Sequence, residues 1–254
     1  MRYLAWNNNL IAAAATTLVA DNATTAHPVT NLKQQTLAQV YRSTDDTDIN
    51  IEVDAGVGSK SYDLLSLAGH NINRAGTVTW TAGATPAFTG FQQSMDWRQF
   101  TMYTRLATPG TYRYHKIRVQ NPTNTDGYVE IGLLWLGAAQ TTPVQVAPEW
   151  EDAEIVLNRE HETDVGVRHG ELLSRQQVCE VLFSGLSTTE ATTLWEGMVI
   201  ESSGSELPIF IIPRDDEYRG WTMNIITHAK RRVNQYQEIV LRFIEAIRGV
   251  AVND

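Results

Sequence analysis

Six histidines, one cysteine and a few short polar clusters are the residues of this 254-residue chain that could carry chemistry. The stretch Gly69-His70-Asn71 stands between an apolar run and an alternating run. A catalytic histidine needs a partner carboxylate or nucleophile, and the neighbouring sequence offers none. Glycine supplies unusual backbone angles, and polar side chains such as asparagine bond to loop backbone. We therefore interpret the stretch as a structural corner of a β-sandwich, and we assign no catalytic residue.

Two other clusters resemble ligand loops but lack essential residues. Residues 56–61, Gly-Val-Gly-Ser-Lys-Ser, would need a glycine in place of Ser59 to wrap a phosphate, so a turn between strands is expected. Asp46-Thr47-Asp48 has the opening spacing of a calcium loop, but Ile51 and Val57 replace the required glycine and glutamate. A solvated turn is the favoured interpretation, and a looser calcium site formed by loop carboxylates is the minor alternative.

The pair His161-Glu162 begins like the helix of a zinc protease. The second histidine of that motif should stand at position 165, which is valine, and His169 would share no helix face with His161. Cys179 lies in an alternating run and is interpreted as a packing residue. The sequence therefore predicts no metal site and no cofactor.

The charge, cysteine content and hydropathy of the chain exclude several classes of protein. Lys and Arg total 20 against 29 Asp and Glu, and the net charge of −9 argues against a sequence-blind nucleic-acid binder, which needs a basic face. One cysteine excludes an intramolecular disulfide. Residues 10–20 are apolar but short, so we expect a first strand there instead of a signal peptide, and no run reaches the length of a membrane span.

Short alternating segments separated by turn residues dominate the first part of the chain. In Thr47–Asp54, the residues Ile49, Ile51 and Val53 alternate with polar ones, as expected for a half-buried strand. The other predicted strands of this part are Tyr62–Leu67, Thr77–Thr81, Tyr112–Val119 and Tyr128–Leu136. Such a pattern is typical of an antiparallel sandwich.

A linker is expected at residues 137–152, so the sequence predicts a sandwich over 1–145 and a second β domain over 146–254. In the second domain Ser187 and Glu190 form a candidate capping box that opens a helix near 187–200. Val178–Phe183 and Pro208–Ile212 are predicted strands. Tyr236–Ile247 fits both a helical and an alternating pattern, and we favour the strand.

Several motifs together resemble a domain found in tail proteins of long-tailed bacteriophages. The matching residues are Asn31 and Leu32; Tyr41, Arg42 and Ser43; Gly69, His70 and Asn71; Gly127 to Gly132; and Leu136 with Gly137. The sequence departs from the family at Tyr41, where tryptophan is commoner, and at Leu133, where a basic residue is frequent. The resemblance covers roughly residues 15–140 and implies a jelly-roll sandwich like galactose-binding and discoidin domains.

The second part is similar, more weakly, to the tail-tube-like domain of distal tail and other minor tail proteins, with Glu245 and Arg248 in its final region. This resemblance implies a structural, non-enzymatic subunit of a tail tip or baseplate. It further implies a homo-oligomeric ring that meets neighbouring tail proteins such as tube, hub and fibres. Such a protein would be made in the bacterial cytoplasm and located in the virion, and would bind neither membrane nor specific nucleic acid.

The alternative function is a carbohydrate-binding module for recognition of a host surface. Sandwiches of this kind stack sugars on loop aromatics, and the candidates are Trp80, Phe88, Phe91 and Trp97. The favoured interpretation of these four side chains is packing in the core or against another subunit. An enzyme such as a cell-wall hydrolase would need paired carboxylates or a metal, and no such constellation is recognisable.

Overall fold

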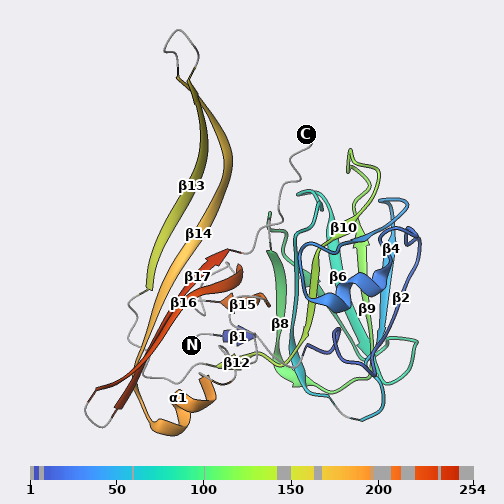
Figure 1. Ribbon diagram of the computed structural model, residues 1–254. Helices are drawn as coiled ribbons and strands as arrows, with labels where there is room; N and C mark the ends of the chain where they lie inside the picture. The colour runs from blue at the N-terminus through green and yellow to red at the C-terminus, as the bar shows by residue number, and fades with distance from the viewer. Residues whose placement is uncertain are drawn as a thin grey trace. The chain divides into compact units, whose positions relative to one another are not determined.

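The computed structural model describes residues 3–5, 9–58, 60–99, 101–141, 150–162, 168–194, 196, 207–212, 221–233 and 236–245. The chain is mainly β, with antiparallel sheets, as the sequence predicted (Figure 1). It divides into two compact units. The first unit contains Met1–Thr142 and Leu207–Thr222 with Arg248–Asp254, and the second contains Pro143–Glu206 and Met223–Ile247.

A five-stranded antiparallel sheet forms one layer of the first unit. Its strands, in spatial order, are β2 (Thr17–Ala20), β4 (Ile49–Asp54), β9 (Tyr114–Gln120), β6 (Thr77–Gly83) and β7 (Phe91–Met95). Strand β4 alternates strictly, with Ile49, Ile51 and Val53 buried and the residues between them half-buried. The alternation predicted for β4, β6 and β9 is confirmed, because one face of this sheet covers the core and the other meets solvent.

A three-stranded sheet forms the opposing layer, with β5 (Tyr62–Ala68) between β11 (Leu133–Gly137) and β8 (Thr101–Gly110). Every residue of β5 is buried, and this strand confirms the one predicted at Tyr62–Leu67. Inward-facing residues of both sheets, among them Ile51, Trp80, Leu67 and Leu134, belong to one apolar cluster. Each such side chain contributes about 1.5–3 kcal/mol when it leaves water, so this shared core stabilises the two-layer sandwich.

The strand predicted over Tyr128–Leu136 is interrupted at Gly132. Its first half becomes β10 (Glu130–Ile131), which pairs with β3 (Tyr41–Arg42), while its second half, β11, pairs with β5. The Gly132 N–H lies 3.1 Å from the carbonyl oxygens of both Ala68 and Gly69. This glycine therefore marks the point where the chain leaves one partner strand for another.

Three further short strands of this unit pair with one another: β1 (Tyr3–Ala5) pairs with β12 (Gln140–Thr141) on one side and β15 (Ile209–Ile212) on the other. Strand β15 confirms the strand predicted at Pro208–Ile212. Its Phe210 is buried in a cluster with Leu64 and Trp135, and its ring centroid lies 5.3 Å from that of Tyr103. The outer face of the three-stranded sheet is thus covered by a segment from late in the sequence.

The second unit is built around a long antiparallel hairpin of β13 (Trp150–Glu162) and β14 (Arg168–Leu186), drawn in yellow and orange in Figure 1. Strand β14 also pairs with β17 (Tyr236–Glu245), and β17 pairs with β16 (Trp221–Val233). The strand predicted at Val178–Phe183 is part of β14. The strand interpretation of Tyr236–Ile247 is confirmed, since this segment has a strand neighbour on each side.

Helix α1 (Thr188–Leu194) opens with the predicted capping box. The Ser187 N–H donates to Glu190 Oε2 at 2.8 Å, and the Glu190 N–H donates to Ser187 Oγ at 3.2 Å. Ala191 and Leu194 are buried, so one face of the helix is apolar. Trp195 and Met198 lie outside the described residues, as does the side chain of Cys179. Within the described ranges, no helix combines the length and apolar character needed to cross a bilayer.

Candidate functional site

The strand registers divide the loops of the sandwich between two ends. Ala20 pairs with Ile51, Ala68 with Thr101 and Thr77 with Gln120, so the segments beyond these residues leave the sheets at the same end. We call this the loop end, formed by residues 21–48, 69–76, 96–99 and 121–129. The other connections, 55–61, 84–90 and 111–113, lie at the opposite end. Function is often carried by loops held on a rigid scaffold, so either end could hold a site.

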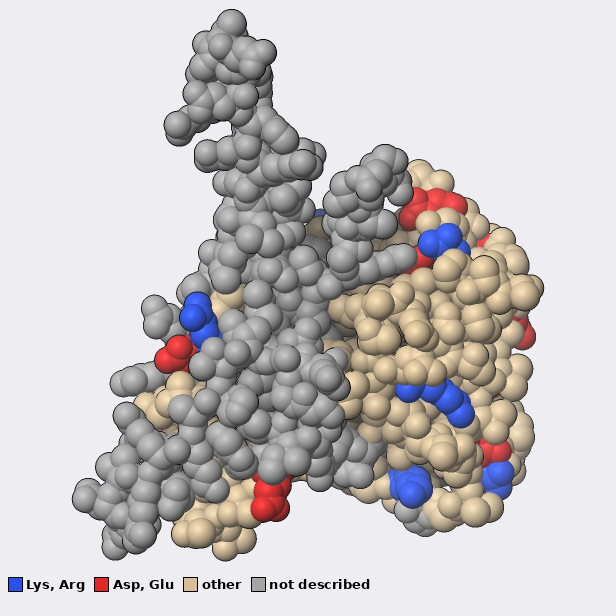
Figure 2. Space-filling model, in the orientation of Figure 1, with Lys and Arg blue, Asp and Glu red and all other residues tan. Residues whose placement is uncertain are grey.

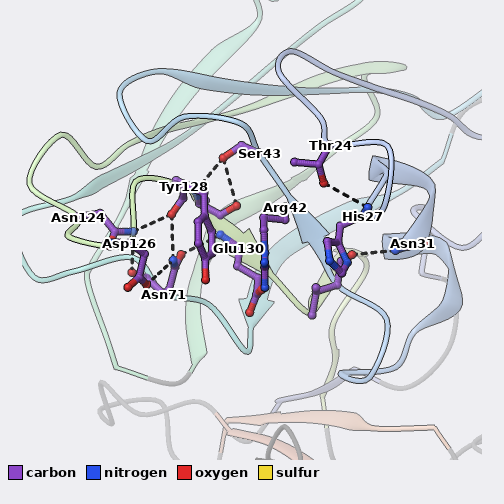
Figure 3. Close-up of polar contacts among 12 residues, drawn as sticks. Thr24, His27, Asn31, Arg42, Ser43, Asn71, Asn124, Asp126, Tyr128 and Glu130 are labelled. Atoms are coloured by element: carbon purple, nitrogen blue, oxygen red, sulfur yellow. Dashed lines mark hydrogen bonds and ion pairs between the residues drawn. The ribbon is translucent and has the colours of Figure 1, made fainter. Parts of the chain in front are cut away.

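Asn71 links the loop 69–76 to the loop 121–129 at the loop end (Figure 3). Its Nδ2 donates to the Tyr128 carbonyl oxygen and to Asp126 Oδ2, both at 2.9 Å. Its Oδ1 accepts from the Glu130 N–H at 2.8 Å. Gly69, two residues earlier, has a φ of +63°, the left-handed conformation that glycine adopts without strain. The predicted structural corner is therefore what the geometry of Gly69 and Asn71 forms.

The His70 side chain bonds to the backbone of this corner. Its Nδ1 accepts from the Ile72 N–H at 3.2 Å. Burial lowers the pKa of His70 to about 4, partly opposed by the backbone of Arg98. The imidazole is therefore neutral near pH 7, and its Nδ1 stabilises the turn by accepting the Ile72 N–H.

Further asparagine side chains form hydrogen bonds between and within the same loops. Asn73 donates through Nδ2 to Thr123 Oγ1 at 2.8 Å, and its N–H donates to Asn121 Oδ1 at 3.2 Å. Asn124 donates through Nδ2 to the Tyr128 carbonyl at 2.8 Å. Loops held by so many side-chain bonds present their remaining polar groups in fixed positions, which lowers the entropy lost when a ligand binds.

Arg42, Tyr128 and Glu130 form a compact group beside Asn71, as Figure 3 shows. Arg42 donates to Glu130 Oε2 through Nε at 3.0 Å and through Nη2 at 2.6 Å. Its guanidinium carbon lies 4.3 Å from the centroid of the Tyr128 ring. The Arg42 and Tyr128 side chains are half-buried, so this group combines fixed hydrogen-bond donors with a partly accessible aromatic ring.

The remaining motif residues support the framework. Asn31 donates to the Val40 carbonyl at 2.8 Å, and Leu32 is fully buried in the core cluster. Gly127 has a φ of +70° and closes the turn before Tyr128. Gly132 marks the strand switch described above, and Gly137 ends β11. All of these residues act on the backbone or the core of the sandwich.

The four aromatic candidates are not brought together. Trp80 is fully buried, and its Nε1 donates to His115 Nδ1 at 3.3 Å, so it is a core residue and cannot hold a sugar. Phe88 and Phe91 lie at the opposite end, where Phe91 packs against the Trp80 ring at a centroid distance of 4.9 Å. Trp97 alone lies at the loop end, half-buried, with Nε1 donating to the Ile72 carbonyl at 2.9 Å.

The opposite end carries a second group of arginine, tyrosine and carboxylate, with Asp54 in the place that Glu130 takes in the Arg42 group. Arg113 donates through Nε and Nη2 to the two carboxylate oxygens of Asp54, at 2.5 and 2.7 Å. Its guanidinium carbon lies 4.8 Å from the centroid of the Tyr114 ring. The hydrogen bond from Arg113 lowers the pKa of Asp54 below its ordinary value. This group gives an internal control for any role assigned to Arg42 and Tyr128.

The phosphate-like and calcium-like stretches form turns and ion pairs. Gly56 and Gly58 have φ values of +81° and +96°, and the Gly56 N–H donates to Asp54 Oδ1, as in a strand-connecting turn. Asp48 accepts from Arg118 Nε and Nη2 at 2.7 and 2.6 Å, which lowers its pKa. Among the side chains that the structure describes, no three carboxylate, imidazole or thiol groups gather as metal ligands.

On the face drawn in Figure 2, the described basic and acidic residues lie singly or beside one another. Elsewhere in the described chain, Lys116 Nζ lies 3.6 Å from Glu52 Oε1, across the neighbouring strands β9 and β4. No broad surface of one sign is visible among the coloured residues of this face.

Two features of the site had no clear signal in the sequence. The Arg42–Tyr128 stack joins residues far apart along the chain, and no spacing rule links them. Asn9 is a buried hub whose Oδ1 accepts from the N–H groups of Ile11 and Leu136, both at 3.1 Å, while its Nδ2 donates to the Leu134 carbonyl. It stands at the end of a run of three asparagines, and the sequence alone gave no reason to single it out.

No protein-family model and no curated protein matches the chain. Solved structures match it over about half its length. A GH29 fucosidase from Ruminococcus gnavus, in complex with fucose, is 16% identical with a TM-score of 0.43, covering 54% of this chain but only 28% of the fucosidase. The family 32 carbohydrate-binding module of NanJ from C. perfringens, in complex with galactose, is 11% identical with a TM-score of 0.39, covering 54% of this chain and 98% of the module. The lectin domain of lectinolysin, complexed with Lewis B antigen, is 13% identical with a TM-score of 0.42, covering 53% and 99%.

Proposed function

We propose that the sandwich of the first unit is a carbohydrate-binding module that recognises a sugar at its loop end. The observation that carries the proposal is the group of Arg42, Asn71, Asp126 and Tyr128, whose polar atoms are held in place by the bonds described above. Sugar hydroxyls exchange bonds with water for bonds with protein at small net gain. Recognition therefore needs donors and acceptors that are already oriented, together with an apolar surface for the sugar ring.

The composition of the loop end suits a neutral hexose. The Arg42 guanidinium donates, the exposed Asp126 carboxylate accepts, and the half-buried Tyr128 ring offers a partial platform. Because Arg42 is already paired with Glu130, its charge is balanced and an anionic sugar is not required. Galactose and fucose, the sugars named in the compared structures, are the first probes.

The experiment is a glycan array followed by calorimetry on the wild-type chain and two matched variants. Tyr128→Ala removes the ring at the loop end, and Tyr114→Ala removes its counterpart at the opposite end. We expect Tyr128→Ala to abolish binding and Tyr114→Ala to retain it. Uniform absence of binding across the array, or equal losses in the two variants, would refute the loop-end site.

A second candidate function is that of a structural subunit in a phage tail tip, assembled as a homo-oligomeric ring. The observation that favours it is the thirteen-residue strand β13, which stands at the edge of the described sheet and pairs there with β14. A long edge strand tends to pair with another chain, which makes it a joint in an assembly. Electron microscopy of tails containing this chain should place it in a ring at the distal end, and its absence from purified tails would exclude this role.

A further inference from the structure

The outer edges of the two sheets in the sandwich differ in how they are protected from other strands. The edge of β11 is occupied by Asn9, whose side chain bonds to the backbone of that strand. Strand β2 is only four residues long and is followed directly by Asp21. Strand β8 contains Arg105 and Pro109, and its register with β5 shifts. Short strands, charges, prolines and register irregularities are devices that prevent an edge from pairing with another chain.

Strand β7 (Phe91–Met95) is the remaining edge, and it has none of these devices. It pairs with β6 in an unshifted register and with no other strand of the described chain. Its sequence, Phe-Gln-Gln-Ser-Met, contains no charge and no proline, and Gln92, Gln93 and Ser94 are exposed. An edge strand of this kind presents unpaired backbone N–H and C=O groups, so it offers a template for another strand.

The whole hairpin that ends in β7 is free of charge. Residues 75–95, between Arg74 and Asp96, include no Asp, Glu, Lys, Arg or His, although charged residues make up 19% of the chain. Two copies of a chain with a net charge of −9 repel one another. That repulsion is smallest where neither copy presents a charge, and the edge of β7 is such a place. A second copy of the chain is therefore the occupant that this edge favours.

We propose that β7 pairs with β7 of a second copy, in an antiparallel register centred on Gln93. Two five-stranded sheets would then form one continuous sheet across a two-fold axis, which is the symmetry of most homodimers. Gln93 would lie opposite Gln93, and Gln92 opposite Ser94 of the other copy. A glutamine side chain both donates and accepts hydrogen bonds, so the pair at the axis is self-complementary. This contact involves neither the proposed sugar site nor strand β13.

The test is sedimentation velocity of the full chain, from micromolar to submillimolar concentrations. The weight-average mass of the wild type should rise towards twice that of one chain. Gln93→Lys places two like charges opposite one another at the axis, and we expect the dimer to be at least about fivefold weaker. Because Gln93 is exposed, the substitution leaves the monomer folded, which circular dichroism checks. A wild type that stays monomeric, or a Gln93→Lys variant that associates as the wild type does, would overturn the proposal.

Further variants separate the β7 contact from association through other surfaces. Val19→Lys is the matched control, because Val19 is 56% exposed on β2, the opposite edge of the same sheet, and this variant should associate as the wild type does. An equimolar mixture of Gln93→Lys with Gln93→Glu places opposite charges at the axis, so it should associate more strongly than either variant alone. Equal association in the mixture and in the separate variants, or a loss in Val19→Lys as large as that in Gln93→Lys, would show that β7 is not the joint.

Discussion

Asn71 holds the carbonyl oxygen of Tyr128 through its side-chain amide at 2.9 Å, across 57 residues of sequence. The other end of the same amide accepts the N–H of Glu130, the residue that pairs with Arg42. One side chain thus fixes the backbone at Tyr128, just before strand β10, and at Glu130, where β10 begins. The position of the Arg42–Tyr128 group depends on this brace, so the corner motif and the proposed binding group are one physical unit.

Replacing Asn71 with alanine should destabilise the sandwich by about 1–3 kcal/mol, because the Glu130 N–H loses the acceptor described above and the Tyr128 carbonyl keeps only the bond from Asn124. The free energy of unfolding, measured by urea titration, checks this. Thr125→Ala is the matched control, since Thr125 is exposed in the loop that Asn71 braces, and it should change the free energy by less than about 0.5 kcal/mol. Equal effects of the two substitutions would contradict the bracing role.

Buried and exposed ion pairs of this sandwich should differ in their effect on stability. Asp63 is buried, accepting from Arg105 Nε at 2.9 Å and from the Ala139 N–H at 2.7 Å, whereas Asp48 pairs with Arg118 at the surface. Asp63→Asn should cost about 1.5–3 kcal/mol, because it weakens two hydrogen bonds that a buried carboxylate accepts, one of them from the half-buried Arg105 guanidinium. Asp48→Asn should cost less than about 1 kcal/mol. Urea unfolding of both variants in the same buffer tests the contrast, and a larger loss for Asp48→Asn would refute it.

His115 should make the sandwich sensitive to mild acid. It is fully buried between Trp80 and Tyr62, and burial lowers its pKa to about 4. Above pH 6.5 neither the folded nor the unfolded chain binds the proton. As the pH falls from 6.5 towards 4, the unfolded chain takes up a proton that the folded chain does not, so stability declines, by up to about 3 kcal/mol.

Urea midpoints measured between pH 7 and pH 4.5 test this dependence. The wild type should lose stability across this window, and His115→Gln should lose less of its own initial stability. The carboxylates with lowered pKa, Asp48 and Asp54, contribute in a separate window below pH 4, because their ordinary value is 3.8. A wild-type midpoint that stays constant from pH 7 to 4.5 would show that His115 has no such effect.

The sequence predicted the elements whose burial follows a period of two. Ile49, Ile51 and Val53 face the core because their alternation matches a sheet with one solvated face, and the capping box at Ser187 and Glu190 is purely local. Strand β8 was not predicted, since its burial alternates only over its first residues and its last part is exposed. Its partner β5 also shifts register between Tyr62 and Leu64.

The candidate site could be predicted only in part. Asn71 was recognised as a corner residue because glycine, histidine and asparagine have local backbone preferences. The partners of Asn71, and the meeting of Arg42 with Tyr128, depend on pairings across more than fifty residues that no local pattern encodes. The aromatic candidates illustrate the same limit, because aromatic residues serve the core and a binding surface equally well, and only the fold assigns Trp80 to the core.

A comparison of Gly69 with Gly127 separates two costs of adding a side chain at the loop end, which are backbone strain and steric clash. Their φ values, +63° and +70°, are nearly equal, so an alanine at either position meets the same left-handed strain of about 1–2 kcal/mol. A Cβ at Gly69 would also lie 2.9 Å from Leu37 Cδ2, whereas a Cβ at Gly127 meets nothing within 4 Å. Because Leu37 is itself buried, its methyl group must shift among packed neighbours, and Gly69→Ala should cost about 1 kcal/mol beyond Gly127→Ala. Thermal and urea unfolding of the two variants measure this difference directly, and a Gly127→Ala loss as large as that of Gly69→Ala would mean that backbone strain alone accounts for both glycines.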